Sequence, residues 1–299
     1  MQERRDLTFT GPSARLQYIL LMGLFRLAVS RGLYGRFARA LGRVFSPDNR
    51  ALLSIDGAPP FPISLDDGYW TRFALWNTQY EPEIARVLTA AAGQAAIFCD
   101  CGANKGYWTL RAAPLFDRVI AAEAAEATFA ELEANAGHLP NVALHRVAIH
   151  SVSGERLSFV NVANSHASAR LLTGDGPGRG DTVETVETRR IDDLLPTGAP
   201  ALIKLDVEGA EVPALEGAAR ALREGAVLIY EDHGSDPTCA PSRYLLSNPD
   251  VCLLFCDDGF RQVTSVDQVR ALKTDRYKGY NFLAAYKNSA LLAAISERF

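Results

Sequence analysis

Two short segments contain most of the residues that could do chemistry in this sequence. The first runs from Asp100 to Gly106 (DCGANKG) and combines an acid at the end of an apolar run with two glycines. The second runs from Ile203 to Glu211 (IKLDVEGAE) and brings four charged groups together after another apolar run. In open α/β sheets, ligands bind outside the carboxyl ends of the strands. We therefore expect both segments to contribute to one ligand site.

The spacing of the glycines in the first segment indicates which ligand it could take. Gly102 supplies the conformational freedom of a tight turn, and Gly106 allows close packing of a helix that starts near Tyr107. The spacing is not the GxGxxG of dinucleotide sites, where backbone N–H groups bind a pyrophosphate. An acid at this position instead favours a cationic ligand such as S-adenosylmethionine, which carries an ammonium and a sulfonium. The predicted cofactor-binding residues of the loop are Asp100, Cys101, Gly102, Ala103, Asn104 and Gly106.

Further cofactor contacts are predicted after the next two strands. Glu123 ends an apolar run 21 positions after Gly102, where Rossmann-type folds place an acid that accepts hydrogen bonds from the ribose hydroxyls. We expect Ala124 beside it to line the same site. Val147 and Ala148 are predicted to lie near the adenine. The alternative is that Asp100 and Glu123 are ordinary acids at strand ends.

The second segment is predicted to form the reacting side of the site. Asp206 should face the transferred methyl group and also contribute to cofactor binding, with Lys204 and Glu208 as further catalytic candidates. Pro213 suits the first turn of a helix that ends near Gly225. Alternatively, Glu208 and Glu211 at this helix start only complement the helix dipole.

A general base is needed if the methyl acceptor is a hydroxyl group. Of the five histidines, only His233 directly follows a predicted core strand, and imidazole is suited to proton transfer near neutral pH. Asp206 is the alternative base, and His233 could equally be an ordinary loop residue. We predict no metal; the alternative is that Asp206, Glu231 and Asp232 together hold a divalent cation.

Alternating apolar runs and helical stretches predict the elements that position these residues. Such alternation indicates βαβ units and a mostly parallel central sheet flanked by helices. The Gly-rich stretch 173–181 is interpreted as a surface loop and not as a phosphate site. The predicted strands are residues 95–99, 118–122, 142–148, 201–205 and 227–230, with late strands at 252–256 and 280–286 and a helix at 83–91.

The first 62 residues predict a basic helical extension and linker ahead of a catalytic domain at 63–299. Residues 1–50 hold nine Arg and three acids, whereas the whole chain has a net charge of -4. Leu16, Ile19, Leu20, Gly23, Leu24 and Leu27 share one helical face, and Arg36, Arg39 and Arg43 share another. This element either docks on the catalytic domain or rests on an anionic membrane surface through residues 15–43.

Composition limits the remaining possibilities. A chain of 299 residues with 48% hydrophobic residues can bury one large core, and its net charge argues against nucleic acid as a partner. Five cysteines without zinc-site spacing fit reduced thiols. The apolar stretch 18–29 is too short to span a bilayer, and no secretory signal is evident. We therefore expect a cytoplasmic protein, with peripheral contact at the inner membrane surface as an option.

The two segments also resemble the FkbM family of methyltransferases. The resemblance covers residues 76–232 and includes Tyr80 to Glu83 and Arg189 to Leu194, but Glu123-Ala124 stands where the family usually has Glu-Pro. It implies a Rossmann-like class I methyltransferase fold, S-adenosylmethionine as donor, and a hydroxyl acceptor on a sugar, glycolipid or polyketide-like small molecule. Two other functions remain open. One is an NAD-dependent oxidoreductase, although this sequence lacks the GxGxxG spacing of that class. The other is a catalytically silent, membrane-tethered binding protein.

Overall fold

The computed structural model of the protein describes residues 3–23, 25–75, 80–161, 169–171, 182–207 and 209–299. Within these, the chain forms two compact units, Met1–Pro82 and Glu83–Phe299. The predicted division into an extension at 1–62 and a catalytic domain at 63–299 stays a prediction. The end of the segment expected to be a linker enters strand β3 (Phe61–Ser64), which buries Phe61 and Ile63.

The N-terminal unit contains a small antiparallel sheet in addition to the predicted helices. Strand β1 (Arg5–Phe9) pairs with β2 (Arg50–Ile55), which pairs with β3. Alternate residues of β2 are buried, as expected for a sheet with one face on a core. The sequence-based prediction of a helical extension missed this sheet. The helices of the unit are α1 (Pro12–Gly23), α2 (Phe25–Ser30), α3 (Tyr34–Gly42), α4 (Gly68–Trp70) and the π-helix η1 (Thr71–Leu75).

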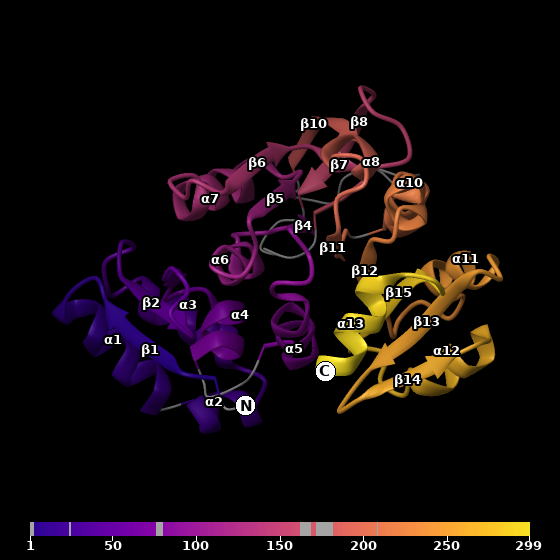
Figure 1. Ribbon diagram of the computed structural model, residues 1–299. Helices are drawn as coiled ribbons and strands as arrows, with labels where there is room; N and C mark the ends of the chain where they lie inside the picture. Colours follow the sequence, from indigo (N-terminus) through magenta and orange to yellow (C-terminus); the bar gives the residue numbers. More distant parts are fainter. Residues whose placement is uncertain (1–2, 24, 76–79, 162–168, 172–181, 208) are drawn as a thin grey trace. The chain divides into compact units, whose positions relative to one another are not determined.

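The second unit is built on an eight-stranded sheet in the order β14-β13-β15-β12-β11-β4-β5-β6 (Figure 1). Neighbours from β12 to β6 are parallel, and the other pairs are antiparallel. Continuous apolar runs form the central strands because both faces are covered. The strands are β4 (Ile97–Cys101), β5 (Arg118–Glu123), β6 (Val142–Arg146), β11 (Ala201–Leu205), β12 (Val227–His233), β13 (Val251–Cys256), β14 (Phe260–Val263) and β15 (Gly279–Tyr286). The predicted mostly parallel α/β sheet is confirmed.

A second sheet, β7-β10-β8-β9, was not predicted from the sequence. It consists of β7 (Ala148–Ile149), β8 (Arg156–Asn161), β9 (Ala169–Leu171) and β10 (Thr182–Arg189). Charged and hydroxyl side chains dominate β10 (TVETVETR), so its apolar pattern is weak. The predicted Gly-rich loop at 173–181 lies outside the described residues.

Helices connect the strands of the main sheet. The helix predicted at 83–91 is confirmed as α5 (Pro82–Ala91), and the helix expected to end near Gly225 is divided into two pieces. A Cβ on Gly217, between the two pieces, would lie 2.2 Å from the carbonyl oxygen of His150, so the chain passes there too closely for a side chain. The helices are α5, α6 (Tyr107–Ala112), α7 (Glu126–Ala136), α8 (Ile191–Leu194), α9 (Glu211–Glu216), α10 (Ala219–Arg223), α11 (Ala240–Leu246), α12 (Val266–Leu272) and α13 (Ala290–Arg298).

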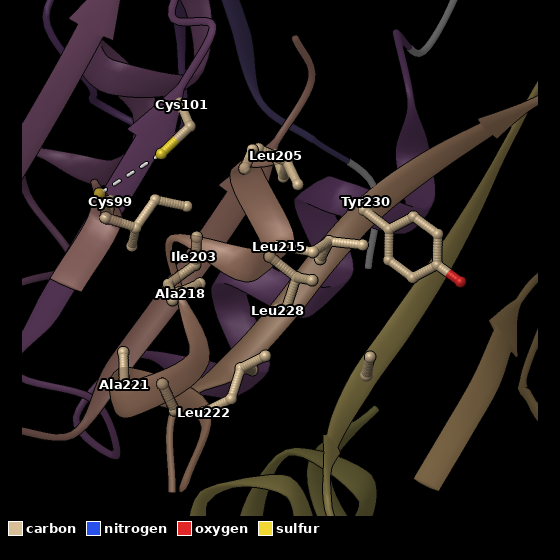
Figure 2. Packing of buried hydrophobic residues seen from close by; sticks show 14 of the residues in the cluster. Cys99, Cys101, Ile203, Leu205, Leu215, Ala218, Ala221, Leu222, Leu228 and Tyr230 are labelled. Atoms are coloured by element: carbon tan, nitrogen blue, oxygen red, sulfur yellow. Dashed lines mark hydrogen bonds between the residues drawn. The ribbon is translucent and has the colours of Figure 1, made fainter. Parts of the chain in front are cut away.

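The hydrophobic core lies against the central strands of this sheet. Figure 2 shows Ile203 and Leu205 of β11 packed with Leu215 of α9 and Ala218 just after it. Cys99 and Cys101 are fully buried on β4, with their sulfur atoms 3.7 Å apart. The hydrogen bond with Cys99, together with burial, raises the pKa of the Cys101 thiol well above its usual range. Such a thiol is inert and serves the core.

Candidate active site

The turn after β4 directs its backbone N–H groups into the protein. Gly102 and Ala103 donate to the carbonyl oxygen of Ala122 at 2.9 and 3.0 Å. The Asn104 N–H donates to Glu123 Oε2, that of Lys105 to Asn104 Oδ1, and that of Gly106 to the Ala103 carbonyl. Each N–H group from residue 102 to residue 106 therefore has a protein acceptor. The backbone N–H groups of residues 102–106 are therefore not available to a phosphate unless these hydrogen bonds break.

Gly102 is required by both its conformation and its surroundings. Its φ is +78°, in the left-handed region, and a Cβ there would lie 1.8 Å from the carbonyl oxygen of Asp206. The Asp206 N–H in turn donates to the carbonyl of Cys101 at 3.0 Å. The two motif segments are thus in direct backbone contact, which is compatible with the expectation that they contribute to one site. At Gly106, with φ of +91°, a Cβ would lie 2.8 Å from Leu132 of α7, which explains the second glycine.

A buried lysine links the two segments through their side chains. Lys204 stands opposite Asp100 in the register of β11 and β4. Its Nζ lies 3.6 Å from Asp100 Oδ1 and 3.2 Å from Asp206 Oδ2, and it donates to the Gly102 carbonyl at 3.5 Å. The side chains of Asp100 and Lys204 are almost fully buried, whereas that of Asp206 is 41% exposed. Lys204, predicted as catalytic, is therefore placed to position Asp206.

Asp100 faces inward and acts through its neighbours. Its Oδ2 accepts a hydrogen bond from the Thr109 hydroxyl of α6 at 2.7 Å. Burial raises the pKa of the Asp100 carboxyl above its usual range, and Lys204 and Thr109 oppose that rise. With no exposed surface, Asp100 ties β4, β11 and α6 together at the carboxyl edge.

Glu123 lies at the end of β5, where the sequence placed the ribose acid. Its Oε2 accepts from the Asn104 N–H at 3.0 Å and its Oε1 from the Ala125 N–H at 2.9 Å. Burial raises the pKa of this carboxyl, and the backbone hydrogen bonds from Ala125 and Asn104 lower it again. A carboxylate oxygen can accept more than one hydrogen bond. Both oxygens therefore keep acceptor capacity for a diol.

The other predicted cofactor residues gather around this strand end. Ala148 packs with Ala125, Val186 and the partly buried Ala124, while Val147 belongs to the main core. These side chains give an apolar wall beside Glu123. Cys101 differs, because its side chain is fully buried in the core and only its main chain reaches the turn.

Two further acids, Glu208 and Glu211, follow Asp206 in the second segment. Glu208 lies outside the described residues. Glu211 begins α9, and its Oε1 accepts from the Gly209 N–H at 3.0 Å. This contact supports the alternative that Glu211 stabilises the start of the helix.

His233 ends β12 at the same edge and is exposed. Its Nδ1 accepts the Ser235 N–H at 3.1 Å and lies 2.6 Å from the Ser235 hydroxyl. In the neutral ring, an accepting Nδ1 leaves the proton on Nε2. His233 is thus arranged as an outward donor, which favours Asp206 over His233 as the base.

Asp232 lies on the opposite face of β12 from Glu231 and His233. Its carboxylate contacts Lys273 Nζ and the Ser242 hydroxyl, both at 2.5 Å. It therefore cannot join Asp206 and Glu231 around a cation. Among the described residues, no group of three or more His, Cys, Asp or Glu is placed to hold a metal ion. The alternative of a divalent cation at these three acids is wrong.

Several residues that support the site were not predicted from the sequence. Thr109 could have been found from its helical position three residues after Gly106, on the side that returns to β4. Ser235 and Lys273 have no comparable signal, because their partners come from separate elements. Asp192, in the Arg189 to Leu194 segment, proves structural: its carboxylate accepts the Arg220 and Ala221 N–H groups at 3.0 and 2.9 Å and caps α10.

The sheet order and the site together define a class of protein. A parallel sheet with an antiparallel β15 inserted beside β12, and with acids at the carboxyl ends of β4, β5 and β11, is a Rossmann-like class I methyltransferase fold. A model of the methyltransferase FkbM domain matches residues 100–262. The chain therefore belongs to the FkbM methyltransferase family, which confirms the resemblance of the two segments.

Solved structures with a similar arrangement include other methyltransferases. An FkbM methyltransferase from Methylobacillus flagellatus KT is 18% identical, with 63% of this chain and 43% of that chain covered and a TM-score of 0.41. The match thus spans less than half of that protein's length. An O-methyltransferase from Bacillus cereus in complex with SAH is 15% identical over 73% of this chain and 86% of that chain, with a TM-score of 0.42. Comparison with curated proteins found no match.

Substitution of Gly102 by Ala should disrupt the contact between the two segments. We expect Gly102→Ala to lower the free energy of unfolding by about 3 kcal/mol or more, because the left-handed φ costs about 1–2 kcal/mol and the new Cβ collides with the Asp206 carbonyl. Gly154 is a matched control, with φ of +84° and nothing within 4 Å of its Cβ position. Equal losses in the two variants during denaturant unfolding would contradict the close contact.

Removal of the Lys204 ammonium group should leave the buried Asp100 carboxyl without its counter-charge and lower the stability of the fold. We expect Lys204→Met to destabilise the fold by about 3 kcal/mol. Without Lys204 the pKa of Asp100 rises further, so the folded state keeps a proton that the unfolded state releases above about pH 4. The loss relative to the wild type therefore grows as the pH rises from the already raised pKa of Asp100 in the wild type to its higher pKa in the variant. Adding Asp100→Asn should abolish that growth; the same pH dependence in both variants would refute the ion pair.

Proposed function

We propose that this protein transfers the methyl group of S-adenosylmethionine to a hydroxyl oxygen of a sugar, glycolipid or polyketide-like small molecule. The observation that carries the proposal is the match to the FkbM methyltransferase domain, which begins at Asp100 and includes Glu123 and Asp206. The comparison with the Bacillus cereus O-methyltransferase crystallised with SAH is consistent with this donor. Methyl transfer to oxygen is a displacement at a cationic sulfonium, so alignment of donor and acceptor supplies much of the catalysis.

The hydrogen bonds of the Gly102 turn favour this donor over a dinucleotide. A pyrophosphate is bound by outward backbone N–H groups at a helix start. In this turn those groups donate to Ala122, Glu123 and other protein acceptors. Carboxylates remain at the edge instead, namely Glu123 and the partly exposed Asp206. Such a set suits hydroxyl and cationic groups, which supports S-adenosylmethionine and argues against NAD.

The residues present fit the parts of the donor. In this proposal the Glu123 carboxylate accepts hydrogen bonds from the two ribose hydroxyls, and Ala124, Val147 and Ala148 lie against the adenine. Asp206, whose carboxylate is paired with Lys204, is partly exposed and contacts Gly102 through its backbone. When bound, the cofactor supplies an electrophilic methyl group.

The acceptor is proposed to enter beside the start of β15. A hollow of about 270 Å³ opens there, and its polar lining includes Glu83, Lys278 and Asn281. The Asn281 amide donates to Glu83 Oε1 at 2.9 Å, which orders part of that lining. Asp206 would accept the proton of the acceptor hydroxyl, and the Nε2–H of His233 would orient the acceptor.

Ligand binding to purified protein tests the donor. We expect S-adenosylhomocysteine at about 100 times its dissociation constant to stabilise the protein by about 2.7 kcal/mol, and NAD to have no effect. Glu123→Gln should weaken S-adenosylhomocysteine binding about tenfold, since a charged acceptor for the ribose is lost, and should reduce the stabilisation to about 1.4 kcal/mol. Glu133→Gln, on the exposed side of α7, is the control.

Three results of this ligand test would overturn the proposed donor site. One is stabilisation by NAD alone. Another is equal weakening of S-adenosylhomocysteine binding by Glu123→Gln and Glu133→Gln. The third is the absence of any stabilisation, which would favour a silent binding protein.

Substitution of the base should separate binding from turnover. With methyl-labelled S-adenosylmethionine and a panel of sugars, glycosides and glycolipids, we expect Asp206→Asn to lower turnover about 100-fold and to leave affinity for S-adenosylhomocysteine within about threefold. His233→Gln should retain most of the turnover, because the Gln amide can replace an outward donor. Wild-type turnover in Asp206→Asn would remove Asp206 as the base, and a larger loss in His233→Gln would reinstate His233.

A further inference from the structure

The outer face of α1 carries aliphatic side chains. Leu16, Ile19 and Leu20 are 53%, 54% and 40% exposed. They follow the helical i, i+3, i+4 spacing and so share one face, called here the apolar α1 face. The opposite side of the helix is the buried one, formed by Ala14, Gln17 and Leu21. The apolar α1 face therefore has a different role from the side that packs on its own unit.

The prediction of an apolar face at these residues is thus refined. Leu16, Ile19 and Leu20 were expected to lie on one face, and they do, but this face is exposed. Gly23, at the end of α1, is exposed as well. Leu24 and the side chain of Leu27 lie outside the described part of the structure. Docking of this face inside the N-terminal unit is excluded for the three described side chains.

The chain segment that carries this face is basic, although Asp66, from outside the segment, lies beside Gly42 at the end of α3. The sequence from Leu7 to Pro47 contains six Arg and no Asp, Glu or Lys. Arg36 and Arg39 on α3, and Arg43 at its end, are exposed and follow one helical face. Val44, next to Arg43, is 80% exposed. Exposed aliphatic groups therefore occur together with cations in a segment that lacks acids.

We propose that the α1–α3 region binds an anionic membrane surface, with the apolar α1 face entering the headgroup boundary and the arginines contacting lipid phosphates. Exposed Leu and Ile gain by leaving water, and each Arg near an anionic surface strengthens binding about fivefold at low salt. Among the described helices, none is long and apolar enough to cross a bilayer.

Two other partners fit these observations less well. Nucleic acid would use the arginines but would leave Leu16, Ile19 and Leu20 in water, since single strands are bound by stacking on aromatic rings. The second unit of the same chain would need an apolar surface for this face. A lipid bilayer satisfies the aliphatic and the cationic groups together.

Vesicle sedimentation of the full chain tests the proposal. We expect binding to phosphatidylcholine vesicles that contain about 30% phosphatidylglycerol, and little binding to phosphatidylcholine alone. The triple variant Leu16→Gln, Ile19→Gln, Leu20→Gln keeps good helix formers and should lose binding about tenfold or more. Arg36→Gln, Arg39→Gln, Arg43→Gln should lose binding similarly at low salt, and raising the salt should weaken the wild type.

Matched controls come from the second unit. Leu115→Gln with Val152→Gln removes exposed apolar groups, and Arg118→Gln with Arg223→Gln removes exposed cations outside the proposed acceptor hollow. Neither pair should change vesicle binding, and all variants should keep the thermal shift with S-adenosylhomocysteine that the wild type shows. Loss of wild-type melting temperature in the α1 triple variant would mean that the face packs within the chain, and the proposal would fail. Absent anionic-vesicle binding, or full binding by either triple variant, would also overturn it.

Discussion

The candidate site depends on the ion pairs of the buried Lys204 ammonium group with Asp100 and Asp206. This ammonium group stands between the carboxylates of Asp100 and Asp206 and also contacts the Gly102 carbonyl. Burying two charged groups on adjacent strands is costly unless they are paired, and here the pairing also fixes the ends of β4 and β11 against each other. The interaction thereby presents one acid, Asp206, to solvent while it keeps another, Asp100, inside.

Backbone hydrogen bonding decides what kind of ligand this edge can recognise. The turn after β4 directs its N–H groups to Ala122 and Glu123, so the groups proposed to recognise a ligand at this edge are carboxylates. Carboxylates accept hydrogen bonds from hydroxyl groups and attract cations, so a site of this kind favours ligands that carry these groups. The same fold with outward N–H groups would select phosphates. The difference between two cofactor classes therefore rests on a few hydrogen bonds in one short turn.

In the N-terminal unit, the two sides of helix α1 differ in what they contact. A helix normally buries its apolar stripe, and α1 buries Ala14, Gln17 and Leu21 instead. The sheet of β1 to β3 buries alternate residues of β2, whereas Leu16, Ile19 and Leu20 remain exposed. A contiguous exposed apolar patch is a mark of an interaction surface, and the proposed membrane contact rests on this patch.

The sequence by itself determined the parallel sheet, the two motif segments and the acid at Glu123, because continuous apolar runs and strand-end acids are local patterns. It also determined the family, through DCGANKGYWTL and IKLDVEGAE. Only the tertiary structure decided that Asp100 is buried, that Lys204 pairs with it across strands, and that Asp232 belongs to Lys273 rather than to a cation site. It also decided which side of α1 is covered. These features depend on the register and packing of elements that are distant in the chain, and no local pattern encodes them.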